Sequence, residues 1–97
     1  METYSVNKLT VKGLNKEIKY DWAYLYVHKV GSISWSLEID EVEEISIFRN
    51  AIRNREHLNI TFSAEYMNGL TGNVMVKRAI DGSVELKGSG KLIGFND

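Results

Sequence analysis

The sequence predicts a small α+β domain rich in β-strands: an antiparallel sheet, or a small barrel or sandwich, of about six strands in the order β-β-β-α-β-β-β with one helix. Three observations predict this class. Apolar and polar residues alternate along most of the chain, as they do in half-buried strands. Turn residues, such as Asp81-Gly82, separate the alternating stretches. Only residues 40–54 carry apolar side chains at helical spacing.

The first third of the chain predicts three strands. Residues 4–12 change the phase of their alternation after Val6, which indicates a strand with a bulge or two short strands. Residues 18–30 read as one long strand that becomes apolar on both faces, so it is the expected centre of the sheet. Residues 33–39 alternate most regularly of all and should form a half-buried strand.

Residues 40–54 are expected to form the helix, with Asp40 as its N-cap and Glu43 at the capping-box position. Acidic side chains lie near its start and arginines near its end, as the helix dipole prefers. One apolar stripe should face the core; it consists of Val42, Ile45, Phe48 and Ile52. Ile45 and Ile47 would also alternate along a strand, so an extended segment is the alternative.

The last third of the chain predicts three more strands. Residues 60–66 alternate again, and segment 67–72 is the expected turn after them. Strands at 74–80 and 84–95 then form a hairpin. A three-residue loop, Asp81-Gly82-Ser83, is expected because a two-residue loop would mix the two faces of this hairpin.

Two glycines of the last strand, Gly88 and Gly90, share one face. We expect them to allow the close approach of another backbone, or to kink the strand.

Composition excludes several classes of function. The chain has 97 residues, too few for two separate cores, so residues 1–97 should form a single domain. The absence of cysteine excludes disulfides, thiolate metal sites and cysteine nucleophiles. Twelve basic and thirteen acidic residues give a net charge of -1, which disfavours nucleic acid as a partner. No apolar run could span a membrane and the start does not resemble a signal peptide, so we expect a cytoplasmic location.

The candidate binding surface is a row of aromatic side chains on one face of segment 18–30. It consists of Tyr20, Trp22, Tyr24, Tyr26 and His28. Such a row can stack on bases or sugar rings. Aromatic residues also pack well in cores, and the favoured interpretation is that this row lies inside, beneath the helix. Its exposure in an open groove is the alternative.

No catalytic residue, cofactor site or metal site is expected. His28 and His57 are the only histidines, and neither has a nucleophile or an orienting acid at a recognisable spacing. The segment from Lys87 to Lys91 lacks the leading glycine and the following Ser or Thr of a phosphate-binding loop. We therefore expect that the chain is not an enzyme.

One part of the sequence resembles a known family. Gly72-Asn73-Val74-Met75-Val76, followed by the segment from Ser83 to Leu92, resembles the closing hairpin of tailed-phage tail-tube proteins. The resemblance covers about the last quarter of the chain. It implies a β-sandwich or barrel with one flanking helix, subunits that stack into rings, and no catalytic residues.

The favoured function is a non-enzymatic protein-binding or assembly module of phage or mobile-element origin, with a second copy or another protein as its partner. An exposed final strand would pair with a neighbour's edge. One alternative is an oligonucleotide- or sugar-binding domain resembling the OB fold, which also places a helix after its third strand. It would add basic residues such as Lys19 and Lys29 to the aromatic row. Another is a small lipocalin-like or cystatin-like ligand binder whose helix closes a cavity.

Overall fold

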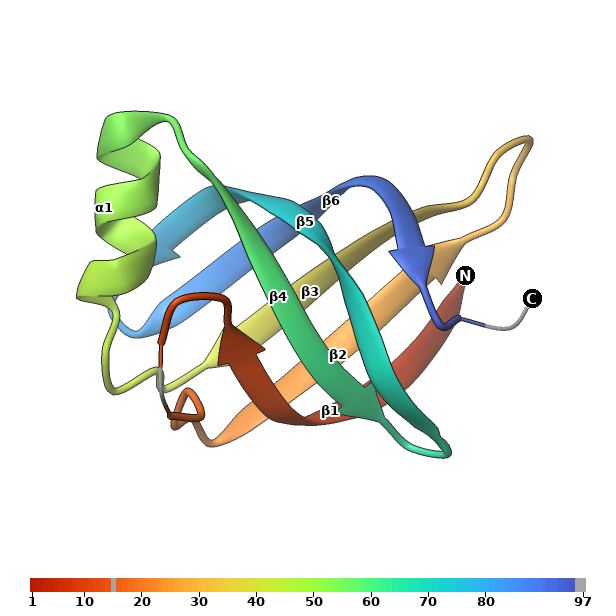
Figure 1. Ribbon diagram of the computed structural model, residues 1–97, viewed down its shortest axis with the longest axis horizontal. Coiled ribbons are helices and arrows are strands. Elements are labelled where there is room, and N and C mark those ends of the chain that lie inside the picture. Colours follow the sequence, from red (N-terminus) through yellow and green to blue (C-terminus); the bar gives the residue numbers. More distant parts are fainter. Residues whose placement is uncertain (15, 96–97) are drawn as a thin grey trace.

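The computed structural model describes residues 1–14 and 16–95 of the chain. Six antiparallel strands close into a barrel in the order β1-β2-β3-β6-β5-β4, with β4 pairing back onto β1 (Figure 1). The strands are β1 (Glu2–Val11), β2 (Trp22–His28), β3 (Ser34–Asp40), β4 (His57–Ala64), β5 (Met67–Ile80) and β6 (Ser83–Ile93). The predicted class, an antiparallel β-rich domain with one helix, is confirmed, and its form is a closed barrel.

The helix α1 (Ser46–Asn54) connects β3 to β4 and lies across one end of the barrel (Figure 1). It begins later than predicted. Asp40 is not its N-cap, because this residue still pairs with Trp22 at the end of β3. Its carboxylate accepts a hydrogen bond of 2.8 Å from the Ser83 hydroxyl. Ile45 is the N-cap residue, and its side chain makes no capping hydrogen bond.

The later start also changes the buried side of the helix. Phe48 and Val42 are buried as predicted, but Ile52 is 40% exposed and Ala51 is buried instead. A short helix that covers the end of a barrel touches it along a narrow line, so only part of the predicted stripe reaches the core. Within residues 1–14 and 16–95, no helix has the length and apolarity needed to cross a membrane.

The barrel interior is filled with side chains. Those that are at most 1% exposed include Leu25, Leu37, Ile39, Ile60, Phe62, Leu70, Val74, Val84 and Leu86. Small barrels are normally packed in this way, with large and small residues combined to fit a narrow interior. The predicted half-buried strand at residues 33–39 is confirmed for Trp35, Leu37 and Ile39.

Trp35 is the largest side chain inside, and two glycines make room for it. A Cβ atom on Gly88 would lie 2.2 Å from the indole ring, and one on Gly72 would lie 2.6 Å from it. The predicted close approach at Gly88 therefore occurs, but to an aromatic side chain rather than to another backbone. Gly90 has a φ of 83°, and the β5–β6 register shifts beside it, so the predicted kink is also present.

The turn between β5 and β6 differs from the prediction. Ile80 pairs with Ser83, so the loop is the two-residue Asp81-Gly82, with φ values of 52° and 85°. Positive φ at both positions is typical of a tight hairpin turn whose twist matches the strands. The prediction of a three-residue loop was wrong. A two-residue loop is compatible with the buried faces because a bulge between Val76 and Arg78 shifts the register farther along β5.

One further turn and one strand boundary also differ from the prediction. The predicted turn at 67–72 is wrong, because β5 already begins at Met67 and the chain turns at Glu65 and Tyr66. The predicted long strand at 18–30 is shorter, since β2 begins at Trp22. The bulge predicted in the first strand is confirmed between Asn7 and Thr10.

The close contact at Gly88 can be tested by adding one methyl group. Gly88→Ala should lower the free energy of unfolding by about 1–3 kcal/mol, the usual cost of overpacking a core. Urea unfolding followed by circular dichroism measures this change. Lys87→Ala, at the neighbouring exposed position, should change it by less than about 0.5 kcal/mol.

A double-mutant cycle shows whether the cost of Gly88→Ala comes from contact with the Trp35 ring or from a general effect of alanine on the strand. In a Trp35→Leu background the ring that the methyl group would meet is gone, so Gly88→Ala should cost clearly less there. An equal cost in both backgrounds would contradict the assigned contact.

Candidate functional site

The predicted aromatic row lies mostly on the outside of the barrel, so the interpretation that it forms core beneath the helix is wrong. Trp22 and Tyr24 are 38% and 37% exposed, and Tyr26 is half-buried. The inner face of β2 instead carries Ala23, Leu25 and Val27, each at most 1% exposed.

The width of the barrel explains this orientation. Side chains alternate between the two faces of a strand, so β2 had to turn either its aromatic or its aliphatic side inward. Trp35 and Phe62 already occupy the interior with their ring centroids 6.4 Å apart. A row of three further rings does not fit beside them in a six-stranded barrel.

Three neighbouring rings on the outside of the barrel form what we call the outer β2 row: Trp22, Tyr24 and the half-buried Tyr26. The ring centroids of Trp22 and Tyr24 are 5.2 Å apart, and those of Tyr24 and Tyr26 are 6.5 Å apart. Both centroid distances lie within the usual range for interacting aromatic side chains, and the ring planes are tilted by 45° and 42° respectively. The row therefore presents a strip of connected aromatic rings to the solvent.

The neighbours of the outer β2 row are hydroxyls on one side and mainly acids on the other. On β1, Ser5 lies opposite Tyr24 and Thr3 opposite Tyr26. On β3 the opposing residues are Asp40, Glu38 and Ser36. None of these directly paired neighbours is basic. Partial burial raises the pKa of Tyr26, and the negative charge of Glu38 raises it further.

Tyr20 and His28 are not part of this strip. Tyr20 precedes β2, and its hydroxyl donates a hydrogen bond of 3.0 Å to the Val6 carbonyl of β1. His28 is exposed at the other end of β2, opposite Ser34. The structure thus keeps three of the five predicted residues together and separates the other two.

Tyr20 belongs to a different feature, the place where β1 and β2 separate. The two strands pair only between residues 2–5 and 24–27. Beyond that point residues 17–21 fill the gap: the Ile18 amide donates to the Leu9 carbonyl at 2.8 Å, and the Asp21 amide donates to the Asp40 carbonyl at 3.0 Å. We call this place the β1–β2 seam.

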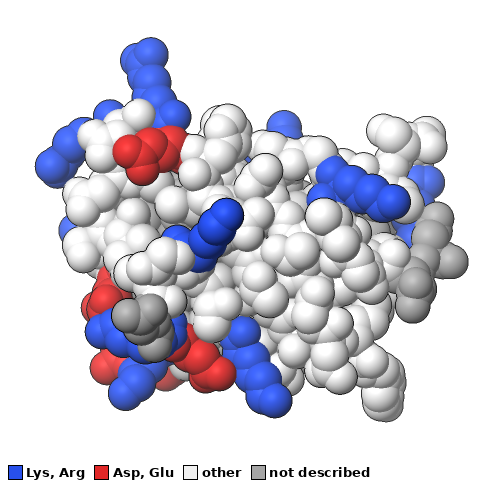
Figure 2. Space-filling view, viewed as in Figure 1, with Lys and Arg blue, Asp and Glu red and all other residues white. Residues whose placement is uncertain are grey.

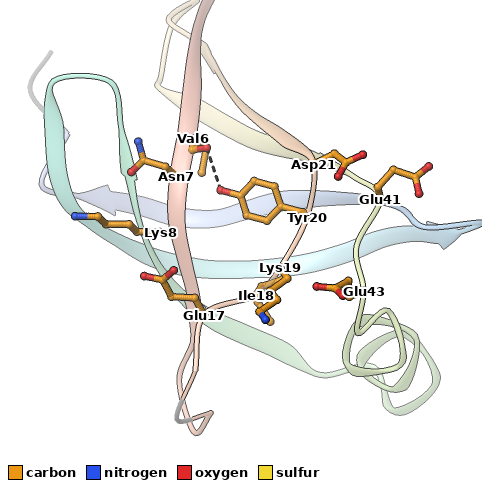
Figure 3. Close-up of a pocket in the computed structure, with 10 residues that line it drawn as sticks. All are labelled: Val6, Asn7, Lys8, Glu17, Ile18, Lys19, Tyr20, Asp21, Glu41 and Glu43. Carbon is orange, nitrogen blue, oxygen red and sulfur yellow. Dashed lines mark hydrogen bonds between the residues drawn. The ribbon is translucent and has the colours of Figure 1, made fainter.

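A cleft of 590 Å³ lies at the β1–β2 seam, with Tyr20 reaching across it toward Val6 (Figure 3). Its charged lining residues are Lys8, Glu17, Lys19, Asp21, Glu41 and Glu43. No group of three or more potential metal ligands occurs among residues 1–14 and 16–95. Burial raises the pKa of Tyr20, and the nearby charge of Glu17 adds to the effect.

The acidic residues predicted near the start of the helix and the two histidines have separate positions. Glu44 forms an ion pair with Lys16, and Glu43 lines the cleft beside Tyr20. His28 and His57 lie on β2 and β4, which are not neighbours in the barrel. The structure does not bring these histidines onto adjacent strands.

The side of the barrel formed by β4, β5 and part of β1 has a different character. Figure 2 shows that charged side chains gather mainly around the rim of this side, with few near its middle. Hydroxyl and amide side chains bond across the strands here: Thr61 to Thr71 at 3.2 Å and Asn59 to Asn73 at 3.0 Å. These groups already pair with one another, so they stabilise the sheet.

The hydrogen bond from Tyr20 gives a test of the β1–β2 seam. Tyr20→Phe should lower the free energy of unfolding at pH 7 by about 1 kcal/mol, because the Val6 carbonyl loses its donor. Chemical denaturation at several pH values measures this difference.

The same variant should also respond differently to alkali. The raised pKa means that Tyr20 ionises more easily in the unfolded chain, so unfolding is favoured as the pH rises past the ordinary tyrosine value of about 10. Tyr26 contributes in the same direction. Stability should fall above that pH in the wild type and fall less steeply in Tyr20→Phe. Equal slopes would contradict the burial of the Tyr20 hydroxyl.

Comparison with protein-family models, curated proteins and solved structures gave no match to this chain.

Proposed function

We propose that this protein is a non-enzymatic protein-binding module and that the outer β2 row is its contact surface. The observation that carries the proposal is the row of neighbouring rings of Trp22, Tyr24 and Tyr26 on the outside of a barrel whose interior is already full. Connected exposed aromatic surface is uncommon on proteins that bind nothing there. Trp and Tyr are also enriched at the centres of protein interfaces.

The charges beside the row favour a basic protein segment as the partner. Cationic side chains bind over the faces of Trp and Tyr rings and pair with carboxylates. Glu38 lies directly opposite Tyr24 and has no ion-pair partner among residues 1–14 and 16–95. An arginine or lysine of a partner placed over Tyr24 would therefore meet both an aromatic face and a carboxylate.

A nucleic acid fits this surface less well. Phosphate groups need lysine or arginine, and the two lysines suggested for an OB-like function lie elsewhere. Lys29 forms an ion pair of 3.1 Å with Glu2, and Lys19 lines the cleft at the β1–β2 seam. The carboxylates beside the rings would repel phosphate.

A sugar is the second candidate for the same surface. Hydroxyl and carboxylate groups flank the rings on both sides, and such groups can bond to sugar hydroxyls while the rings stack. The OB fold also binds its ligands on the face of its second and third strands. An internal ligand cavity, as in a lipocalin, receives no support from the filled interior.

Assembly with a second copy belongs to the same proposal, and the resemblance to tail-tube proteins supports it. The closed barrel restricts how copies would join. Residues 84–87 of β6 pair with β3 on one side and with β5 on the other, so this part of the final strand offers no free edge. Copies would then have to meet through side-chain surfaces.

The proposal is tested by mapping amide chemical shifts in NMR spectra. The probes are an acetylated peptide of alternating glycine and arginine, a cello-oligosaccharide and oligothymidylate. The peptide should shift the amides of residues 22–26 and the Trp22 indole. The double variant Trp22→Ala/Tyr24→Ala should bind it at least about tenfold more weakly.

A matched control uses an aromatic residue elsewhere. Tyr66 is 99% exposed in the turn between β4 and β5, so Tyr66→Ala should leave peptide binding unchanged. Equal losses in both variants would contradict the assignment, as would peptide shifts outside β2 and its neighbours. A response of the row to the oligosaccharide alone would replace the protein partner with a sugar.

A further inference from the structure

The seam between β3 and β6 is open at the end of the barrel opposite α1 (Figure 1). The two strands pair from Ile39 with Val84 to Ser36 with Lys87, and the ladder stops there. Before Ser36, Ser34 and Trp35 pair only with β2. Beyond Lys87, β6 continues to Ile93 but pairs only with β5. We call this place the β3–β6 seam.

At the β3–β6 seam, a side chain of β3 takes the place of the backbone ladder. The Trp35 ring lies where a side chain of Gly88 would be, and its Nε1 donates a hydrogen bond of 3.0 Å to the Gly90 carbonyl. Gly90 has a φ of 83°, a left-handed conformation that glycine adopts without strain and that interrupts the regular extension of β6. The opening is therefore built into the packing of Trp35.

An apolar cleft of 520 Å³ occupies the opening. Its apolar side chains are Ile33, Leu92 and Phe95, and the backbone of Gly88 and Gly90 lines it as well. Phe95 is held in place by an edge-on contact with Tyr4, whose ring centroid is 6.0 Å away. Ile33 is 43% exposed on the opposite wall.

The cleft also has a cation at its rim. Lys91 lines it, is exposed, and has no ion-pair partner among residues 1–14 and 16–95. A ligand that places a carboxylate beside an apolar group would match both properties of the cleft.

The β1–β2 seam shows what such an opening accepts. There the chain fills the gap with its own residues 17–21, which bridge to β1 at Thr10 and Glu17. The Ile18 amide bonds to the Leu9 carbonyl, and its side chain is 5% exposed. An extended segment with one apolar side chain thus bridges this seam, beside the cleft that Tyr20 spans. Among the described residues, no such segment completes the β3–β6 seam.

We propose that the β3–β6 seam binds an extended segment of another protein. The segment places an apolar side chain against Ile33, Leu92 and Phe95, and an acidic side chain beside Lys91. The Gly90 carbonyl already accepts the Trp35 indole N–H. The other backbone groups at the walls of the cleft have no ladder partner across the seam, so they are positioned to pair with this segment as a β-strand. This site is separate from the outer β2 row and does not depend on it.

The probe for this site is an acetylated pentapeptide of alternating glutamate and isoleucine. Binding is measured from amide shifts and from the fluorescence of Trp35, read in a Trp22→Phe background. The peptide should shift Ser34, Gly90 and Leu92. Lys91→Glu should weaken binding at least about tenfold, since the change replaces an attractive charge with a repulsive one.

Two controls keep the test specific. Lys12→Glu makes the same charge change at an exposed lysine that lines a different cleft, and it should leave binding unchanged. The double variant Trp22→Ala/Tyr24→Ala should also bind the pentapeptide normally, which separates this site from the outer β2 row. A pentapeptide with serine in place of isoleucine should not bind.

Several results would overturn the proposal. These are equal effects of Lys91→Glu and Lys12→Glu, equal binding of the serine pentapeptide, and shifts that map away from the seam. Binding of decanoate without binding of the pentapeptide would assign the cleft to a small amphipathic anion and exclude the peptide.

Discussion

The indole ring of Trp35 lies inside a six-stranded barrel against two glycines, and the rest of the molecule depends on that placement. Because Trp35 and Phe62 fill the interior, β2 turns its aliphatic side inward and its aromatic side outward. The same ring lies against Gly88 and bonds to the Gly90 carbonyl of β6, two residues that line the apolar cleft where the β3–β6 ladder has ended. Both candidate binding surfaces therefore follow from the packing of one core residue.

Much of the fold could be predicted from local alternation, but the inward face of β2 could not. Leu37 and Ile39 alternate with polar residues, so the pattern itself identifies their buried face. Along β2 both faces are apolar, and the choice depends on the width of the closed barrel, a property of the whole fold. The small side chain of Ala23 was the one local signal for the inner face.

The turn after β5 and the start of the helix show the same limit. Asp81-Gly82 by itself indicated a two-residue turn, but the bulge that makes this turn compatible with the buried faces lies beyond Val76. Asp40 carries the residue type of an N-cap, yet pairing with Trp22 keeps it in β3. In each case a contact distant in sequence decided between two locally reasonable structures.

A closed barrel changes how a small β domain can bind. It leaves few free strand edges, so contacts must use side-chain surfaces or the places where neighbouring strands separate. Although the net charge of the chain is only -1, the charges beside these two kinds of site differ in sign. Carboxylates border the outer β2 row, whereas a lysine borders the β3–β6 seam, so the two surfaces suit partners of opposite charge.

Hydrogen exchange of the two indole N–H groups tests this account most directly. Trp35 is 2% exposed and bonded to the Gly90 carbonyl, so its indole proton should exchange slowly, while that of Trp22 should exchange rapidly. The Trp22→Phe variant assigns the two signals. Slow exchange of both protons would mean that the aromatic row is buried, and rapid exchange of Trp35 would mean that the barrel is not packed around it.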